Sequence, residues 1–173
     1  ALEEGLLVYI GEEIDKKYID DLKTLTIRED LVKKHAKDLK IIYTPIHGSG
    51  NVPVRRILKE LGYENVFVVK EQEMPDGNFP TAPYPNPEDP KVFKLALDMA
   101  KEIQPDIIFG TDPDCDRIGV VVKDNNGEYQ VLSGNQTGML LTNYILSSLK
   151  EMNKLPENGA VIKTIVTTES VRK

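Results

Sequence analysis

The sequence predicts an α/β fold in which a mixed, mainly parallel sheet is flanked by helices, with parts of neighbouring domains attached. Short β-branched and aromatic runs alternate with amphipathic helical stretches in the middle of the chain. A strand at 40–44, a helix of about ten residues and a strand at 65–70 imply a parallel, right-handed crossover. Farther along, strands at 117–123 and 129–132 flank a Gly-containing turn and are predicted to form an antiparallel hairpin.

Composition bounds the class of protein. The 173 residues are 40% hydrophobic and 29% charged, which is typical of soluble globular domains. No apolar run approaches the roughly 20 residues that a membrane-spanning helix needs. The net charge of −6 and the pI near 5.1 argue against a nucleic-acid partner. The single cysteine, Cys115, gives no disulfide framework and favours a reducing cytoplasmic location. The oligomeric state is left open.

The first 39 residues are expected to end one domain and connect it to the next. Residues 6–10 are predicted to be a short strand, and residues 12–25 and 28–37 to be helices. The chain begins with Ala1 and ends inside an apparent helix start, so we expect it to be a piece of a longer protein.

Residues 40–132 are predicted to be one complete domain. After its first strand, Asn51 is expected to cap a helix that has Pro53 in its first turn and Gly62 as its stop. The segment 71–89 holds five prolines and is predicted to be an irregular loop, ordered by burial of Phe79 and Tyr84.

A helix is predicted to follow this Pro-rich loop, with Asp89 as its cap and Pro90 at its first position. Its apolar residues recur at helical spacing and should face the core: Val92, Phe93, Leu95, Ala96, Met99, Ala100 and Ile103.

Residues 133–173 are expected to be the truncated start of a further domain. Ser133 to Asn135 should open a helix that runs to about Met152, and residues 160–167 are predicted to be a strand.

Three carboxylates on alternate residues, Asp112, Asp114 and Asp116, form the main candidate site. Apolar runs lead in and out, so the loop is predicted to join two strands. A solvated acidic turn is the alternative. Like charges at this spacing repel unless a cation neutralises them, and hard oxygen donors favour Mg²⁺ or Ca²⁺. An EF-hand is excluded, because the sixth and twelfth loop positions hold Arg117 and Lys123 in place of Gly and Glu.

Arg117 has two possible roles. It either offsets the negative charge of the loop or contacts a phosphate that shares the metal. Because Mg²⁺ commonly binds a few carboxylates together with substrate phosphate oxygens, the residues predict a divalent-metal phosphoryl site.

Other candidates are weaker. The turn at 44–51 should lie at the same sheet edge as the acidic loop, and its two glycines permit approach of an anion or simply form a turn. His47 is either an acid or base or, as we favour, a histidine that hydrogen-bonds its own loop. Cys115 is interpreted as a small packing residue because no partner base is evident.

Four stretches resemble the α-D-phosphohexomutase superfamily, and within it the phosphoglucomutase (phosphoglucomutase/phosphomannomutase) branch. TPIHGSG at 44–50 resembles the opening of that family's second domain, and PDGNFPTAPYPNPE at 75–88 its Pro-rich loop. TDPDCDR at 111–117 resembles its metal-binding loop, and SGNQTGMLL at 133–141 the start of its third domain. The resemblance implies a domain II fold flanked by the end of domain I and the start of domain III.

The resemblance implies reversible interconversion of glucose 1-phosphate and glucose 6-phosphate by way of a phosphoserine and a bisphosphorylated sugar. Asp112, Asp114 and Asp116 would bind Mg²⁺, and Arg117 would lie beside the phosphate; the full-length protein would bind a hexose phosphate. The family's phosphoserine, sugar-binding and phosphate-binding loops are absent from these residues. The resemblance therefore assigns no catalytic residue here, and the chain alone is predicted to be inactive.

Three alternatives stay open. Phosphomannomutase or phosphopentomutase activity belongs to the same superfamily, and a non-catalytic module that binds metal or a partner is of another class. A haloacid-dehalogenase-type phosphatase would use Asp112 as nucleophile and Asp114 as acid or base. The third carboxylate, Asp116, followed directly by Arg117, argues against a phosphatase of this type.

Overall fold

Five strands form one mixed sheet in the computed structural model, which describes residues 1–172. Strands β1 and β3 lie at the centre, β2 and β5 lie at the edges, and the spatial order is β2-β1-β3-β4-β5. β1 is parallel to both β2 and β3, whereas β4 is antiparallel to β3 and to β5. The mixed α/β prediction is confirmed. The strands are β1 (Lys40–Thr44), β2 (Asn65–Val68), β3 (Ile107–Thr111), β4 (Ile118–Lys123) and β5 (Tyr129–Leu132).

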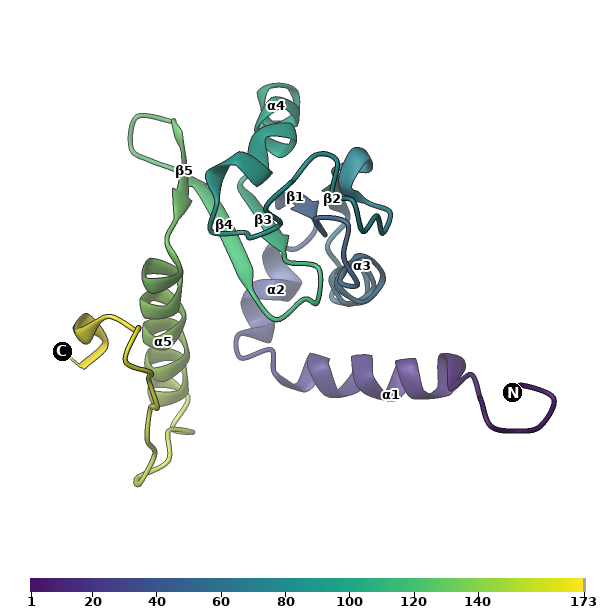
Figure 1. Ribbon diagram of the computed structural model, residues 1–173. Coiled ribbons are helices and arrows are strands. Elements are labelled where there is room, and N and C mark those ends of the chain that lie inside the picture. Colours follow the sequence, from purple (N-terminus) through teal and green to yellow (C-terminus); the bar gives the residue numbers. More distant parts are fainter. Residues whose placement is uncertain (173) are drawn as a thin grey trace.

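Two helices make the parallel connections. Helix α3 (Asn51–Glu60) joins β1 to β2, and helix α4 (Lys94–Ile103) joins β2 to β3. The chain moves outward from β1 to β2 and then back past β1 to β3. Because the two crossovers run in opposite directions along the sheet, α3 and α4 lie on opposite faces of it (Figure 1). As predicted, Gly62 lies just beyond the end of helix α3, and its φ of 92° suits glycine.

The hydrophobic core lies between the sheet and α4. Alternate residues of the central strands point to this face, and the small alanines of α4 let the helix approach closely. Phe93, in the 3₁₀ turn before α4, is fully buried there. The buried residues of this core are Ile42, Ile46, Val69, Ala82, Val92, Phe93, Ala96, Ala100, Ile108 and Val121.

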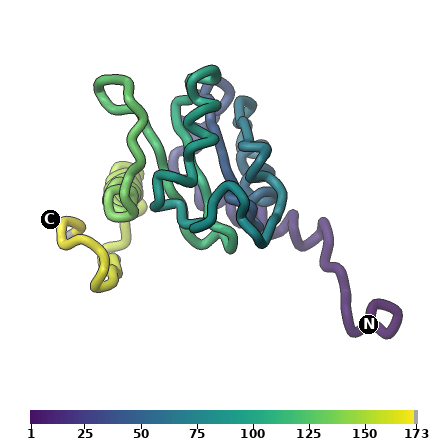
Figure 2. Tube along the Cα trace, turned by 45° about the horizontal axis from the view of Figure 1, so that its top comes forward, coloured from purple at the N-terminus to yellow at the C-terminus, as the bar shows by residue number. Residues whose placement is uncertain are grey.

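The N-terminal part reaches away from the sheet (Figures 1 and 2). Helix α1 (Gly11–Thr24) buries Ile19 and is tied to α3 by two ion pairs, Arg56–Glu12 and Lys23–Glu60. A short helix, α2 (Glu29–His35), leads from it to β1. Both predicted helices are confirmed.

The predicted strand at 6–10 is wrong. These residues form no strand, and the side chains of Leu6 and Tyr9 are each 81% exposed. Extended backbone becomes a strand only where another strand pairs with it, and none lies beside this segment in the described part of the chain.

The Pro-rich segment between β2 and α4 is irregular apart from two 3₁₀ turns, η1 (Lys70–Gln72) and η2 (Pro90–Phe93). Asp89 caps η2 by accepting a hydrogen bond from the Lys91 backbone N–H, so the helical segment begins as predicted. Of the two side chains expected to be buried, Phe79 is half-buried and Tyr84 is mostly exposed; the segment buries Ala82 and Pro87 more completely. Gly119 on β4 makes room for Pro87, because a Cβ there would overlap the Pro87 carbonyl.

The sequence predicts that Ser133 to Asn135 open one helix and that Asn51 caps another. Helix α5 (Gly134–Glu151) begins at a capping box formed by Ser133 and Gln136, in agreement with the prediction. Asn51, in contrast, is already the first residue of α3, and its side chain accepts from Arg55 at 3.1 Å. The predicted Asn51 cap is therefore wrong.

Helix α5 lies to one side of the core domain, below β5 in Figure 1. Residues 160–167 form no strand, and Ile162 and Ile165 are 94% and 98% exposed. That prediction fails for the same reason as the one at 6–10. The described chain closes with a 3₁₀ turn, η3 (Glu169–Arg172). No helix among residues 1–172 combines the length and hydrophobicity needed to cross a membrane.

Replacing Gly119 by Ala is expected to lower the free energy of unfolding by about 1–3 kcal/mol, as at other overpacked sites. Urea denaturation followed by circular dichroism measures this change. Gly77→Ala is the matched control, because Gly77 lies outside the helices and strands and nothing lies within 4 Å of a Cβ there. A Gly119→Ala protein as stable as the control would show that the Pro87 contact is not tight.

Candidate metal centre

The acidic loop is the connection of the β3–β4 hairpin. Thr111 at the end of β3 pairs with Ile118 at the start of β4, and residues 112–117 join them. The turn after β1 lies at the same sheet edge, because β1 and β3 are parallel neighbours. Connections leave β1 and β3 toward different sides at this edge. Ligand sites of open α/β sheets commonly lie at such switch points.

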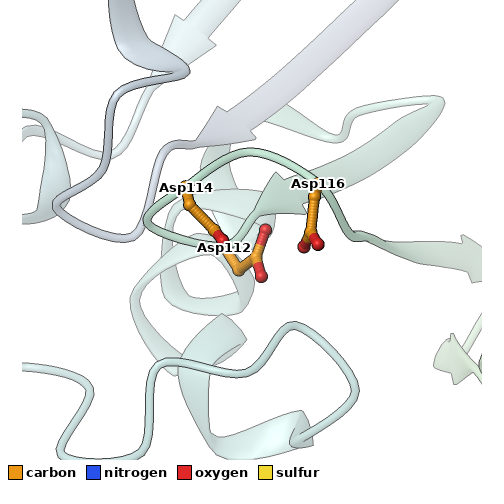
Figure 3. A group of neighbouring side chains, drawn as sticks. All are labelled: Asp112, Asp114 and Asp116. Atoms are coloured by element: carbon orange, nitrogen blue, oxygen red, sulfur yellow. The ribbon is translucent and has the colours of Figure 1, made fainter.

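The structure brings the three predicted carboxylates together. One oxygen each from Asp112, Asp114 and Asp116 lies within 4.8 Å of the others. Asp112 is fully buried, whereas Asp114 and Asp116 are exposed. Figure 3 shows the Asp114 side chain directed toward that of Asp112, with the Asp116 carboxylate beside them. The group therefore combines one buried carboxylate, Asp112, with two carboxylates that face solvent.

Arg117 closes the loop onto Asp112. Its backbone N–H donates to Asp112 Oδ1 at 2.9 Å, and its Nε donates to Oδ2 at 2.7 Å. Burial alone would raise the pKa of Asp112, but the backbone and guanidinium hydrogen bonds of Arg117 outweigh it and lower the pKa. Asp112 is thus held as a carboxylate, and Arg117 offsets its charge.

The remaining charge of the loop is unbalanced. Repulsion from Asp114 raises the pKa of Asp116, and partial desolvation by the loop and repulsion from Asp112 add to the effect. Three carboxylates against one guanidinium leave two formal negative charges. Each carboxylate oxygen has a second lone pair, so the bonds to Arg117 do not prevent Asp112 from binding a cation. Hard oxygen donors carrying a double negative charge fit a divalent cation of the Mg²⁺ or Ca²⁺ class.

His47 lies in the turn after β1 and is bound on both sides. Its Nδ1 donates to the Met74 carbonyl at 3.0 Å, and its Nε2 lies 3.0 Å from Thr81 Oγ1. Its ring also meets Phe79 edge to face. The predicted hydrogen bonds to the histidine's own loop are wrong, because both ring partners belong to the Pro-rich segment; the contacts nevertheless fit a structural role for His47.

Two glycines let the turn after β1 contact the acidic loop. A Cβ on Gly48 would overlap the backbone of Pro113, and one on Gly50 would lie 2.7 Å from Cys115 Sγ. Cys115 is half-buried, and its φ of 63° turns the chain back toward β4. These contacts fit the interpretation of Cys115 as a packing residue.

A buried polar network beneath the turn was not anticipated from the sequence. Thr44 Oγ1 donates to Gln72 Oε1 at 2.6 Å and accepts from the Ile46 backbone N–H. Gln72 Nε2 donates in turn to the Val92 carbonyl. A glutamine just beyond a strand carries no distinctive sequence signal, because its burial depends on tertiary packing.

Comparisons with known proteins assign the family. The family model for phosphoglucomutase/phosphomannomutase, alpha/beta/alpha domain II, matches residues 16–127, which include the acidic loop. The chain belongs to the phosphoglucomutase/phosphomannomutase family. The match begins within α1, and the predicted domain boundaries near 39 and 132 stay predictions.

Relatives of this family member carry different names. It is 36% identical over 168 residues to a phosphoglucomutase of Staphylococcus saprophyticus, covering 97% of this chain and 29% of that protein. It is 33% identical over 171 residues to a phosphomannomutase of Mycoplasmoides pirum, covering 99% of this chain and 30% of that protein. The chain thus spans less than a third of the length of these relatives.

A solved structure supports the fold. The crystal structure of a phosphoglucomutase/phosphomannomutase family protein from Burkholderia thailandensis aligns with a TM-score of 0.52 and 26% identity. The alignment covers 70% of this chain and 26% of that one.

Asp112→Asn is expected to lower the free energy of unfolding at pH 7 by about 1.5 kcal/mol, the low end for hydrogen bonds to charged groups. Because folding lowers the pKa of Asp112, its stabilisation is full above the unfolded value of about 3.9 and is lost as the pH falls through the folded value. The difference between wild type and variant should therefore shrink below about pH 4. Urea titrations at pH 7, 5 and 3 measure it.

Asp116→Asn is the control for this experiment. It removes the same charge from an exposed carboxylate that is repelled by Asp114, so stability at pH 7 should be unchanged or slightly higher. Equal losses in the two variants would contradict the assignment of Asp112 as the anchored member of the group.

Proposed function

We propose that this chain carries the metal-binding loop of a phosphoglucomutase that interconverts glucose 1-phosphate and glucose 6-phosphate by way of a phosphoserine and a bisphosphorylated sugar. The observation that carries the proposal is the group of three converging carboxylates beside Arg117, within the residues that match domain II. Phosphoryl transfer depends mainly on positioning and charge neutralisation, and a divalent cation held by this loop would supply the charge neutralisation.

In this proposal Asp112, Asp114 and Asp116 hold Mg²⁺. When bound, the ion would neutralise charge on the transferred phosphoryl group. Asp112 provides the fixed ligand because Arg117 orients it, while the exposed Asp114 and Asp116 face the side from which a phosphate would approach.

Arg117 is proposed to serve both of its predicted roles. It contacts Asp112 through Nε, yet its side chain stays 52% exposed. The guanidinium presents five N–H donors in a planar fork, so one edge can orient Asp112 while another is directed to a phosphate oxygen.

Glucose phosphate is the proposed substrate because relatives named phosphoglucomutase are 36% and 38% identical to this chain. Relatives named phosphomannomutase and probable phosphomannomutase match at 33% and 36% identity, and one named phosphopentomutase matches at 37%, so these activities are the competing assignments. In the complete protein, the ratio of kcat/KM for glucose 1-phosphate to that for mannose 1-phosphate tests the choice. A ratio below one would overturn it.

The 173 residues alone are proposed to lack mutase activity. No stretch of the sequence resembles the phosphoserine loop that donates the phosphoryl group in this family. Turnover of glucose 1-phosphate by the purified chain, in an assay coupled to oxidation of glucose 6-phosphate, would contradict this.

Asp114→Asn is expected to weaken Mg²⁺ binding by about tenfold or more, since affinity for hard cations follows the charge of the ligands. Isothermal titration calorimetry measures the change in Kd. Asp98→Asn is the matched control, because it removes one negative charge from the exposed surface of α4. If both variants bind Mg²⁺ like wild type, the metal assignment fails.

A further inference from the structure

We propose that the turn His47–Gly48–Ser49–Gly50, called here the clamp turn, positions the metal loop, with Gly48 and Ser49 as the positioning residues that set its affinity for Mg²⁺. The inference rests on the proposed function, because it takes residues 112–117 to bind a divalent cation. Gly48 and Ser49 are not among the proposed metal ligands and act on them through the loop backbone.

Ser49 makes two hydrogen bonds to a single atom of the metal loop, residues 112–117. Its backbone N–H and its hydroxyl both donate to the Pro113 carbonyl oxygen, at 2.8 and 3.1 Å. Pro113 stands between the ligands Asp112 and Asp114 and has no N–H of its own. Its carbonyl is therefore the one backbone hydrogen-bonding group at that residue, and Ser49 holds it twice.

Gly48 brings the two backbones into direct contact. A Cβ at this position would overlap the Cα, carbonyl carbon and oxygen of Pro113, so every other residue type would push the two loops apart. On the far side of Ser49, Gly50 leaves room for Thr111 and Cys115, each 2.7 Å from where its Cβ would lie. Glycines thus flank the hydrogen-bonding serine on both sides.

The clamp turn is itself fixed by contacts outside the metal loop. The His47 backbone N–H donates to the Gln72 carbonyl at 2.9 Å, and both ring nitrogens are bound to the Pro-rich segment. Gly48 N–H closes the turn onto the Pro45 carbonyl. Ile46 and His47 have φ values of 47° and 59°, in the left-handed region that side chains seldom adopt. Because these contacts hold the clamp turn independently of the metal loop, we infer that the turn fixes the position of the metal loop backbone.

The position of Pro113 affects how closely the three carboxylates can converge on a cation. Mg²⁺ demands near-octahedral oxygens at about 2.0–2.1 Å, so ligand atoms spread over 4.8 Å must converge on it. Asp112 is anchored by Arg117, whereas Asp114 depends on the backbone path through Pro113 and on the Cys115 N–H bond to the Asp112 carbonyl. Displacing Pro113 therefore moves Asp114 relative to the fixed Asp112.

Isothermal titration calorimetry with MgCl₂ on the purified chain tests the proposal. Gly48→Ala should weaken binding about tenfold or more, in the range known for residues that orient metal ligands. Ser49→Ala should weaken it about threefold, since the Ser49 N–H bond is retained. Ser49→Thr keeps the hydroxyl and should stay within about twofold of wild type. Gly77→Ala is the matched control, because a Cβ there meets nothing within 4 Å.

Urea unfolding of each metal-free variant separates positioning from stability. If Gly48→Ala and Ser49→Ala are folded and bind Mg²⁺ like wild type, whatever their stability, the clamp proposal is overturned. Should Gly48→Ala fail to fold, the comparison of Ser49→Ala with Ser49→Thr decides alone. Equal Mg²⁺ affinity of wild type and Asp114→Asn would refute the metal assignment and the clamp with it. A weaker Asp114→Asn with unchanged clamp variants would refute only the clamp.

Discussion

The site depends on the pairing of a buried carboxylate with the arginine five residues later. A buried charge is costly unless its lone pairs are satisfied, and Asp112 is satisfied by two donors of Arg117. This pairing closes residues 112–117 into a compact loop and fixes one oxygen ligand in place. The other two carboxylates are exposed and repel each other, so the loop combines a rigid base with an uncompensated negative surface.

Where strands pair, the sequence was a good guide. The β-branched runs at 40–44 and 107–111 form the centre of the sheet, and the hairpin that follows has the predicted antiparallel direction. The grouping of Asp112, Asp114 and Asp116 was also predictable, because their spacing and the flanking strands are local features. Such features need no knowledge of distant contacts.

The two wrong strand predictions share a physical cause. Residues 6–10 and 160–167 have strand-like composition but no pairing partner in the described chain, and β propensity without a neighbour does not make a strand. Ser49 and Gln72 were overlooked for a related reason. Their importance comes from partners 64 and 20 residues away in sequence, and no local pattern records such contacts.

The hairpin that carries the acidic loop has a thermodynamic consequence. The pairing of Thr111 with Ile118 holds both ends of residues 112–117 at the spacing of adjacent strands. Most of the conformational entropy of closing this loop is therefore lost when the sheet forms. When a cation binds later, the loop loses little further conformational entropy. The affinity of such a preorganised loop for a cation is governed by electrostatics and by the placement of the donor atoms. Substitution of single side chains can therefore change this affinity without a change of fold.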